Sequence, residues 1–183
     1  MTEVEFAAWP KTPRLFRDII ITEKIDGTNA ALHIDAEGNV TAQSRKRLIY
    51  PHDDNFGFAN WAAENAAILA PLLGPGVHFG EWWGRGIQRN YGLTERRFSL
   101  FNVHRHADID AEVGGARVNT VPVLYQGPFR EEEITHWLSS LAMFGSVAVP
   151  GFADPEGICV FHTASRNVYK VTLDNNDAGK WEH

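Results

Sequence analysis

The sequence has almost no cysteine: Cys159 is the only one among 183 residues. A single cysteine excludes an intramolecular disulfide, and it argues against a structural zinc site built from the eight histidines. Cys159 lies in the apolar run GICVF, which predicts a buried structural thiol. Low cysteine usage is typical of a reducing compartment, so we expect a cytoplasmic location.

A long apolar run and a surplus of positive charge are also missing. No stretch approaches the roughly 20 apolar residues of a membrane helix, so we expect no membrane partner. The first residues, MTEVEFAAWPK, lack the basic start and apolar core of a signal peptide. The net charge of −6 argues against binding long nucleic acids through overall charge.

Positive charge is instead concentrated in three short segments. For any one of them alone, solvated loop charge is the ordinary interpretation. The segments are SRKR (Arg45, Lys46, Arg47), GRGIQRN (Arg85, Arg89) and ERR (Arg96, Arg97).

Apolar spacing predicts a mostly antiparallel α+β domain with two substantial helices. The helices are expected at residues 56–73 and 130–144, the second with three glutamates in its first turn. A hairpin is expected at 30–45, around a Glu37-Gly38-Asn39 turn. The other expected strands are 18–25, 77–83, 97–105, 116–127, 157–164 and 167–174.

One lysine stands at an unusual place. In ITEKIDGTNA, Lys24 follows a β-branched run and precedes an Asp26-Gly27 turn that leads to Asn29. Alone, Lys-x-Asp-Gly arises by chance in roughly a few per cent of chains this long, so a surface lysine at a hairpin is the simpler explanation. The alternative, a nucleophilic amine held in a cleft, requires partner groups elsewhere in the chain.

Partner groups follow the lysine in a defined order. They are Ser44-Arg45, Glu81 in FGEWW, Phe101 in FSLFNV, Glu156-Gly157 in PEGICVF and Lys170 in VYKVT. With EKIDGTN, this series resembles the covalent nucleotidyltransferase superfamily of ATP-dependent DNA ligases, RNA ligases and mRNA capping enzymes. It looks most like the RNA ligases of the nick-sealing and RNA-repair type, and the resemblance covers residues 20–173.

The resemblance implies a catalytic set. In the family, the motif lysine attacks the α-phosphate of ATP and forms lysyl-AMP, so Lys24 is the expected nucleophile. A free lysine has a pKa of about 10.4, so a nucleophilic amine needs surroundings that favour its neutral form. Lys170 would supply a nearby cation, and Glu156 would bind Mg²⁺ or Mn²⁺ or orient the amine.

The same resemblance implies residues that hold the nucleotide. Arg45, beside Ser44, would bind a phosphate or a ribose with its guanidinium fork. Glu81 would accept hydrogen bonds from the ribose hydroxyls. Phe101 would stack on adenine, whereas Phe98, three positions earlier on the strand, is expected in the core.

The residues around the lysine have implied roles of their own. Glu23 would contact the base edge, and Asn29 a phosphate or the RNA end. Asp26 would either fix the turn or make a catalytic contact, with Gly27 supplying a permissive backbone.

Two positions depart from the family pattern. Asn102 follows the stacking aromatic where the family usually has aspartate. Thr172 stands where many relatives have a second lysine in the last strand, so one amine of the pair is missing unless Lys180 replaces it.

The expected protein is therefore an ATP-dependent RNA ligase that forms lysyl-AMP, transfers AMP to a 5′-phosphate end and seals it to a 3′-OH. We expect one minimal nucleotidyltransferase domain over 1–183 without an appended OB-fold. A homodimer or a partner protein could add contacts to RNA ends or a nicked duplex. Alternatives are a DNA nick ligase or guanylyltransferase of the same fold, or a turnover-deficient module that binds nucleotides or RNA ends. The residues expected to touch nucleic acid are Arg45, Lys46, Arg47, Arg85 and Arg89.

Overall fold

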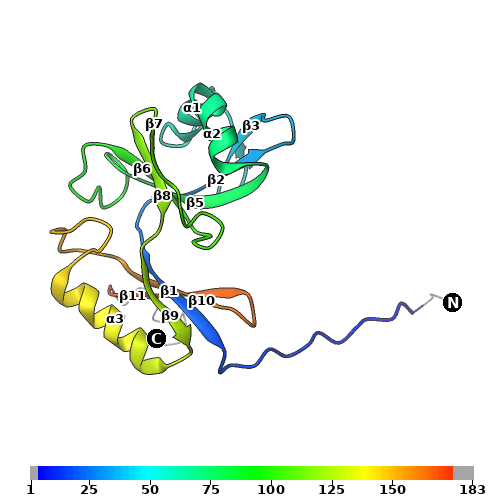
Figure 1. Cartoon of the computed structure of the whole chain (residues 1–183), viewed down its shortest axis with the longest axis vertical. Helices are drawn as coiled ribbons and strands as arrows, with labels where there is room; N and C mark the ends of the chain where they lie inside the picture. Colours follow the sequence, from blue (N-terminus) through cyan, green and yellow to red (C-terminus); the bar gives the residue numbers. More distant parts are fainter. Residues whose placement is uncertain (1–3, 175–183) are drawn as a thin grey trace.

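The computed structural model describes residues 4–174, which form eleven strands and three helices (Figure 1). The strands are β1 (Asp18–Lys24), β2 (Thr28–Ile34), β3 (Val40–Ser44), β4 (Leu48–Ile49), β5 (Gly76–Gly84), β6 (Arg96–Leu100), β7 (Asp110–Val113), β8 (Ala116–Thr120), β9 (Val123–Pro128), β10 (Gly157–His162) and β11 (Asn167–Thr172). The helices are α1 (Phe58–Glu64), α2 (Ala66–Leu73) and α3 (Glu131–Phe144).

The strands form two sheets. One has four strands in the order β11-β10-β1-β9, and the other has seven in the order β4-β3-β2-β5-β6-β8-β7. All neighbouring strands pair antiparallel except β6 and β8, which are parallel. The predicted α+β class with mostly antiparallel strands is confirmed.

Each sheet has its own apolar core. Helices α1 and α2 pack on the seven-stranded sheet through a cluster that includes Trp61, Trp82 and Phe98. Helix α3 packs on the four-stranded sheet through Leu141, which meets Ile19 and Ile158. Phe98 is fully buried, which confirms its predicted place in the core.

The chain passes between the sheets at two adjacent places. Residues 25–27 lead from β1 to β2, and Val121-Pro122 lead from β8 to β9. The Glu23 amide donates to the Pro122 carbonyl at 3.0 Å, and the Val121 amide donates to Leu100 at 3.1 Å. Ile25 and Val121 share a third apolar cluster with Trp83 and Tyr91, so the sheets are joined by packed side chains.

The prediction of one strand over 116–127 is wrong. Pro122 has no backbone N–H and cannot continue a ladder, so β8 ends at Thr120 and β9 begins in the other sheet. Strand β7, which pairs with β8, was not predicted.

Two further boundaries differ from the predictions. The helix expected at 56–73 is interrupted at Asn65, whose side-chain amide donates to the Trp61 carbonyl at 2.8 Å. The strand expected at 97–105 ends at Leu100, and turns follow because the Asn102 side chain accepts a hydrogen bond from the Arg105 amide. The predicted helix at 130–144 is confirmed as α3.

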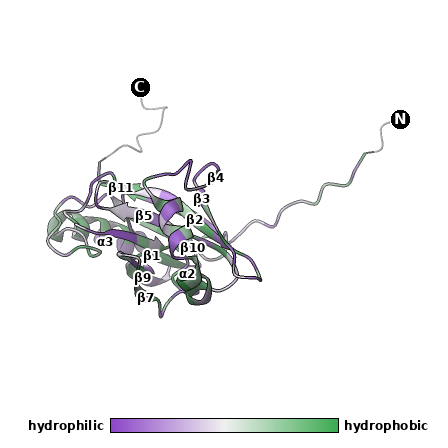
Figure 2. Ribbon diagram, turned by 90° about the horizontal axis from the view of Figure 1, so that it is seen from above, coloured by the Kyte–Doolittle hydropathy of each residue, from purple (hydrophilic) through white to green (hydrophobic). Residues whose placement is uncertain are grey.

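An extended arm precedes β1. Residues 4–14 are exposed throughout and run away from the body on the side opposite α3, as the two views in Figures 1 and 2 agree. Among residues 4–174, no helix combines the length and apolar character that crossing a bilayer requires.

Candidate active site

A cavity of about 550 Å³ lies between the two sheets, within the roughly 300–1,000 Å³ typical of small-molecule sites. Thr22 and Lys24 share one face of β1 because strand side chains alternate. The β1–β10 register sets Thr22 opposite Cys159 and Lys24 opposite Gly157. Further lining residues include Asn29, Val77, Phe79, Glu81, Phe101, Asn102, His104 and Phe161.

Lys24 lies in this cavity as an ion pair with Glu156. The Lys24 Nζ is 2.5 Å from Glu156 Oε1, and the two side chains are 22% and 19% exposed. Glu156 directly precedes β10, and its carbonyl accepts a hydrogen bond from the Leu173 amide at 2.9 Å. The backbone hydrogen bonds of β1 and of Glu156 therefore fix both residues, and the Lys24 amine points at one carboxylate.

The second oxygen of Glu156 is available for a ligand. Glu156 Oε2 is buried and has no hydrogen-bond partner within residues 4–174. A buried carboxylate oxygen without a donor is costly, and a cation would satisfy it. The same residues contain no preformed group of three His, Cys, Asp or Glu side chains that could hold a metal. Mg²⁺ is commonly held by one or two carboxylates together with substrate phosphates, and Glu156 fits that pattern.

Glu81 faces the lysine from β5. Its two oxygens accept hydrogen bonds from the Gly27 amide at 3.1 Å and from Asn29 Nδ2 at 3.0 Å. The side chain is buried, and burial raises the pKa of Glu81 to about 7, although nearby Lys24 acts to lower it. The Lys24 turn is thus fastened to the seven-stranded sheet by a carboxyl group that titrates near neutral pH.

This titration predicts a pH-dependent stability. The usual pKa of 4.5 applies to the unfolded chain, so folding takes up a proton between pH 4.5 and about 7. Stability therefore falls as pH rises through that window, by about 3 kcal/mol for Glu81. We expect Glu81→Gln, which cannot titrate, to lack this loss.

Urea unfolding of the nucleotide-free protein at several pH values within that window tests the expectation. As pH rises, the unfolding free energy of Glu81→Gln should increase relative to that of the wild type. Parallel pH profiles would show that Glu81 does not titrate in this way.

Gly27 is required for space. A Cβ at this position would lie 2.5 Å from the Trp82 carbonyl oxygen and 2.6 Å from Trp83 Cβ. Gly27 has no positive φ, so the turn needs its missing side chain at this close approach to β5, and not the permissive backbone that was expected. Asp26 is held on the other side, where its amide donates to the Tyr91 hydroxyl at 2.9 Å.

Glu23 points away from Lys24, as strand alternation requires. It is 1% exposed, and its carboxylate accepts hydrogen bonds from the Ser146 hydroxyl at 2.6 Å and from the Val147 and Ala148 amides at 2.8 Å each. Burial raises the pKa of Glu23 against the effect of these donors. Glu23 thereby fixes the loop after α3. It is also among the residues that line the cavity, so its contact to a base edge stays a prediction.

Arg89 is not part of an open basic surface. Its Nε donates to Asp26 at 3.1 Å, its Nη1 contacts Asp154 at 2.7 Å, and its Nη2 contacts Asp174. The side chain is 17% exposed. The expectation that Arg89 binds nucleic acid is therefore corrected: it ties the Lys24 turn to the segments before β10 and after β11.

We expect Arg89→Ala to lower the free energy of unfolding by about 2 kcal/mol, because three aspartates lose their common cation. Arg85→Ala is the matched control, since Arg85 lies four positions earlier and is exposed. The control should change stability by less than about 0.5 kcal/mol. Equal effects of the two variants in urea unfolding would contradict the role assigned to Arg89.

The remaining basic residues divide into exposed and structural ones. Arg45, Lys46 and Arg47 are exposed in the turn after β3, and Arg47 pairs with Asp53. Neither Ser44 nor Arg45 is among the described residues that line the cavity. Ser44 pairs with Ala30 and is two strands away from β5, at the sheet end that also carries Glu81. Their contacts to a nucleotide or an RNA end stay predictions.

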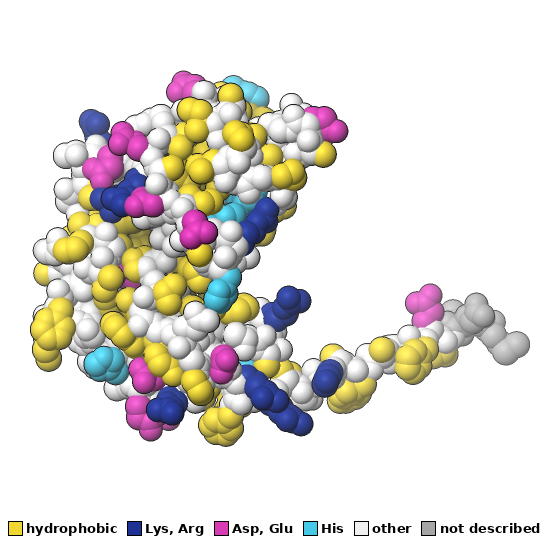
Figure 3. All heavy atoms as spheres, viewed as in Figure 1, with side chains coloured by type: hydrophobic (Ala, Val, Ile, Leu, Met, Phe, Trp, Pro, Cys, Tyr) yellow, Lys and Arg dark blue, Asp and Glu magenta, His cyan; other side chains and the backbone are white. Residues whose placement is uncertain are grey.

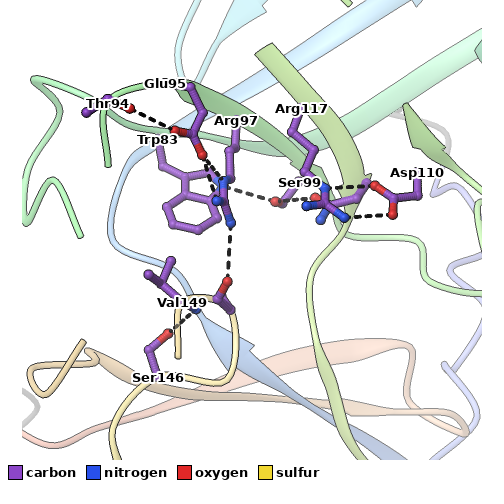
Figure 4. Close-up of polar contacts among 11 residues, drawn as sticks. Trp83, Thr94, Glu95, Arg97, Ser99, Asp110, Arg117, Ser146 and Val149 are labelled. Carbon is purple, nitrogen blue, oxygen red and sulfur yellow. Dashed lines mark hydrogen bonds and ion pairs between the residues drawn. The ribbon is translucent and has the colours of Figure 1, made fainter. Parts of the chain in front are cut away.

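Arg96 and Arg97 have structural contacts. Arg96 Nη1 donates to the Phe56 carbonyl at 2.6 Å. Arg97 lies over the Trp83 ring, binds Glu95 and donates to the Ala148 carbonyl at 3.2 Å, so it spans from β6 to the loop that Glu23 also holds (Figure 4). Solvated loop charge therefore does not describe this pair.

Aromatic and sulfur side chains face the cavity from opposite sheets. Phe101 is 43% exposed just after β6, and Cys159 lies on β10. Burial raises the pKa of the Cys159 thiol to about 11, so the thiol stays protonated and unreactive. Cys159 is half-buried, which confirms the prediction of a buried structural thiol only in part. Strand alternation from Lys24 would have found Thr22, and the β1–β10 register sets Cys159 opposite Thr22.

Strand β11 brings Lys170 to the side of the four-stranded sheet that faces the cavity. Its register sets Lys170 beside Cys159, and Thr172 beside Gly157. Val168, two positions earlier, lines the cavity, so Lys170 and Thr172 share its face. Lys180 lies outside the described residues.

Two of the histidines form a buried pair. His78 Nε2 donates to the Gly74 carbonyl at 2.8 Å, so its Nδ1 accepts from His106 Nε2 at 3.3 Å. Burial lowers the pKa of His78, and it lowers the pKa of His106 to about 4. Both rings are neutral at physiological pH. His104, which was expected on a strand, lies in the turn region after β6 and faces the cavity.

Comparison with known proteins places this geometry in a family. The family model described as RNA ligase matches residues 17–172. No curated protein matches the sequence significantly.

Solved structures of RNA ligase from Naegleria gruberi share the fold. A lysine-to-alanine variant with ATP and Mn has a TM-score of 0.60 at 17% identity, over 86% of this chain and 49% of that chain. A structure with PPi has a TM-score of 0.57 at 19% identity, over 86% and 50%. The chain thus spans about half the length of these solved chains.

Proposed function

The chain belongs to the RNA ligase family, and from this premise we propose that it is an ATP-dependent RNA ligase that works through lysyl-AMP on Lys24. The observation that carries the proposal is an amine held 2.5 Å from a carboxylate inside a cavity of nucleotide size. The similar Naegleria gruberi ligase has been solved with ATP and Mn and with PPi, which supports ATP as the nucleotide.

In the first step, Lys24 Nζ attacks the α-phosphorus of ATP. A P–N bond forms, the bond to the leaving phosphate oxygen breaks, and pyrophosphate departs. Glu156 orients the amine and can accept the proton that it loses. A divalent ion on Glu156 would screen the charge of the triphosphate.

The cavity walls suggest how the nucleotide would lie. Phe101 and Cys159 would flank the adenine, since a flat base suits an aromatic face and an apolar wall. Glu81 would accept the ribose hydroxyls, as each of its oxygens keeps a second lone pair beyond the Gly27 and Asn29 contacts. Lys170 would hold phosphates alone, with Thr172 offering a hydroxyl in place of a second amine.

The later steps concern RNA. A 5′-phosphate oxygen attacks the phosphorus of lysyl-AMP and frees Lys24, giving an RNA capped by AMP. A 3′-OH then attacks the 5′-phosphate, the phosphodiester forms and AMP leaves. Asn29 would contact the phosphate end, and Arg45 would act at the cavity mouth in these steps.

Incubation with ATP, GTP or NAD⁺ labelled in the nucleoside monophosphate, together with Mn²⁺ or Mg²⁺, tests the proposal. After denaturation we expect a covalent label from ATP. A label from GTP instead would indicate a guanylyltransferase, and binding without any label would indicate a turnover-deficient module. Sealing of nicked RNA but not nicked DNA duplexes is then expected, and the reverse preference would indicate a DNA ligase.

A further inference from the structure

The arm before β1 carries large apolar side chains in water. Phe6 is 93% exposed and Trp9 is 92% exposed. Burying such a side chain is worth about 1.5–3 kcal/mol, so aromatic residues held away from the body mark a surface that another molecule covers.

The arm also carries regularly spaced positive charge. Lys11, Arg14 and Arg17 recur every three residues, and residues 6–17 contain no aspartate or glutamate. Pro10 and Pro13 favour an extended polyproline conformation, which has three residues per turn. In that conformation Lys11 and Arg14 share one edge, and Arg17 follows a turn in which its amide donates to the Leu15 carbonyl at 2.9 Å.

The same period places the aromatics apart from the cations. Phe6 and Trp9 are also three residues apart, so they share a second edge of a polyproline segment. The arm, defined as residues 4–17, thus presents a stacking edge and an edge that carries Lys11 and Arg14 together with Glu5, in a chain whose net charge is −6.

The foot of the arm is fixed to the body. His162 Nε2 donates to the Leu15 carbonyl at 2.7 Å, and the Phe129 amide donates to the Arg17 carbonyl at 2.9 Å. The Phe16 and Phe129 rings meet edge to face at 6.1 Å. The arm therefore joins the body at a defined place. It ends directly before Asp18, the first residue of β1, and Lys24 is the last residue of the same strand.

The arm extends on the hollowed side of the molecule. Figure 3 shows a concave face between the upper and lower halves, with Lys and Arg side chains at its rim and at the foot of the arm. A strand leaving the cavity on this side would pass the arm.

We propose that the arm binds single-stranded RNA, namely the strand whose end is held at Lys24. Bases would stack on Phe6 and Trp9, while Lys11, Arg14 and Arg17 would neutralise phosphates, the combination that sequence-tolerant single-strand binding uses. A second copy of this chain is the other occupant to test, but its exposed acidic repeat, Asp108, Asp110 and Glu112, recurs every two residues and not every three. The inference rests on the proposed function for the identity of the strand.

The length of β1 sets a minimum strand length. Seven residues at about 3.3 Å each separate the arm from Lys24 by roughly 20 Å. At about 3.4 Å per stacked nucleotide, this distance needs about six nucleotides. A shorter RNA should fill the cavity without reaching the arm.

The test compares two 5′-phosphorylated, 3′-fluorescent single-stranded RNAs, one of about 16 and one of about four nucleotides. Binding to the full chain is measured by anisotropy, without ATP, at about 50–200 mM salt. The arm variants are Phe6→Ala with Trp9→Ala, and Lys11→Gln with Arg14→Gln. The matched controls are Phe144→Ala, an exposed aromatic on α3, and Arg117→Gln on β8.

We expect the aromatic variant to weaken binding of the long RNA about 10- to 100-fold. The charge variant should reduce the slope of log K against log salt by about 1.4, the value for two phosphates of a single strand. Neither variant should change binding of the short RNA, and both controls should match wild type.

Several outcomes would overturn the inference. One is long-RNA affinity within twofold of wild type in both arm variants, and another is absence of RNA binding by the wild type. A third is a wild-type dimer by light scattering that the arm variants dissociate without loss of RNA affinity. If the arm governs RNA affinity but ATP never labels the protein, the proposed function fails and the arm's role remains.

Discussion

Lys24→Ala is expected to form no covalent nucleotide adduct at all. The alanine variant has no amine at this position, so no P–N bond to the nucleotide can form there. Because the Lys24 side chain is partly exposed and its ion pair is with Glu156, folding should persist. Denaturing gels of protein incubated with labelled ATP and Mn²⁺ measure the adduct, and thermal unfolding checks the fold.

Lys24→Arg separates the charge of this residue from its nucleophilicity. The guanidinium keeps a cation beside Glu156, but it stays protonated and cannot attack phosphorus. We therefore expect ATP binding without adduct. An adduct in either variant, mapped by peptide mass spectrometry to another residue, would overturn the assignment of Lys24.

The cavity could be predicted from the sequence because its main residues come from strand ends. Lys24, Glu81 and Glu156 each lie in or beside an apolar strand that is easy to recognise. The order of motifs then implied a shared site. In the structure Lys24 and Glu81 line one cavity, and Glu156 joins them through its ion pair with Lys24. Their side-chain directions follow from strand alternation and needed no tertiary information.

The basic residues could not be sorted in this way. Arg45 and Arg89 look alike in sequence, since each lies in a short polar segment with another arginine nearby. Arg89 is distinguished only by its aspartate partners, which come from residues 26, 154 and 174. Such a cluster is produced by the packing of two sheets, and local spacing carries no signal of it.

The two glutamates beside the motifs show the same limit. Glu23 and Glu81 are both buried acids close to the motif lysine or its turn. Glu81 holds the turn that carries Lys24, whereas Glu23 holds the loop at residues 146–148. Because that loop is more than 100 positions away, only the fold reveals which side of β1 it covers.

Glu156→Gln is expected to slow adduct formation by about 10²- to 10³-fold, the usual effect of losing a general base or an electrostatic contact in a closed site. The amide keeps the shape of the side chain but removes the charge that orients the Lys24 amine. It also removes the buried anionic oxygen that fits a divalent ion.

Stability should change little in this variant, because the substitution removes a charge whose second oxygen lacks a donor among the described residues. Glu112→Gln is the control, since Glu112 is an exposed carboxylate on β7. Single-turnover labelling at several Mn²⁺ concentrations separates the two effects of Glu156. If high Mn²⁺ restores the rate, the residue acts mainly in holding the ion, and if it does not, the contact to the amine dominates. A variant that labels at the wild-type rate would remove Glu156 from the chemistry, and its pairing with Lys24 would then serve only to keep a buried amine in place.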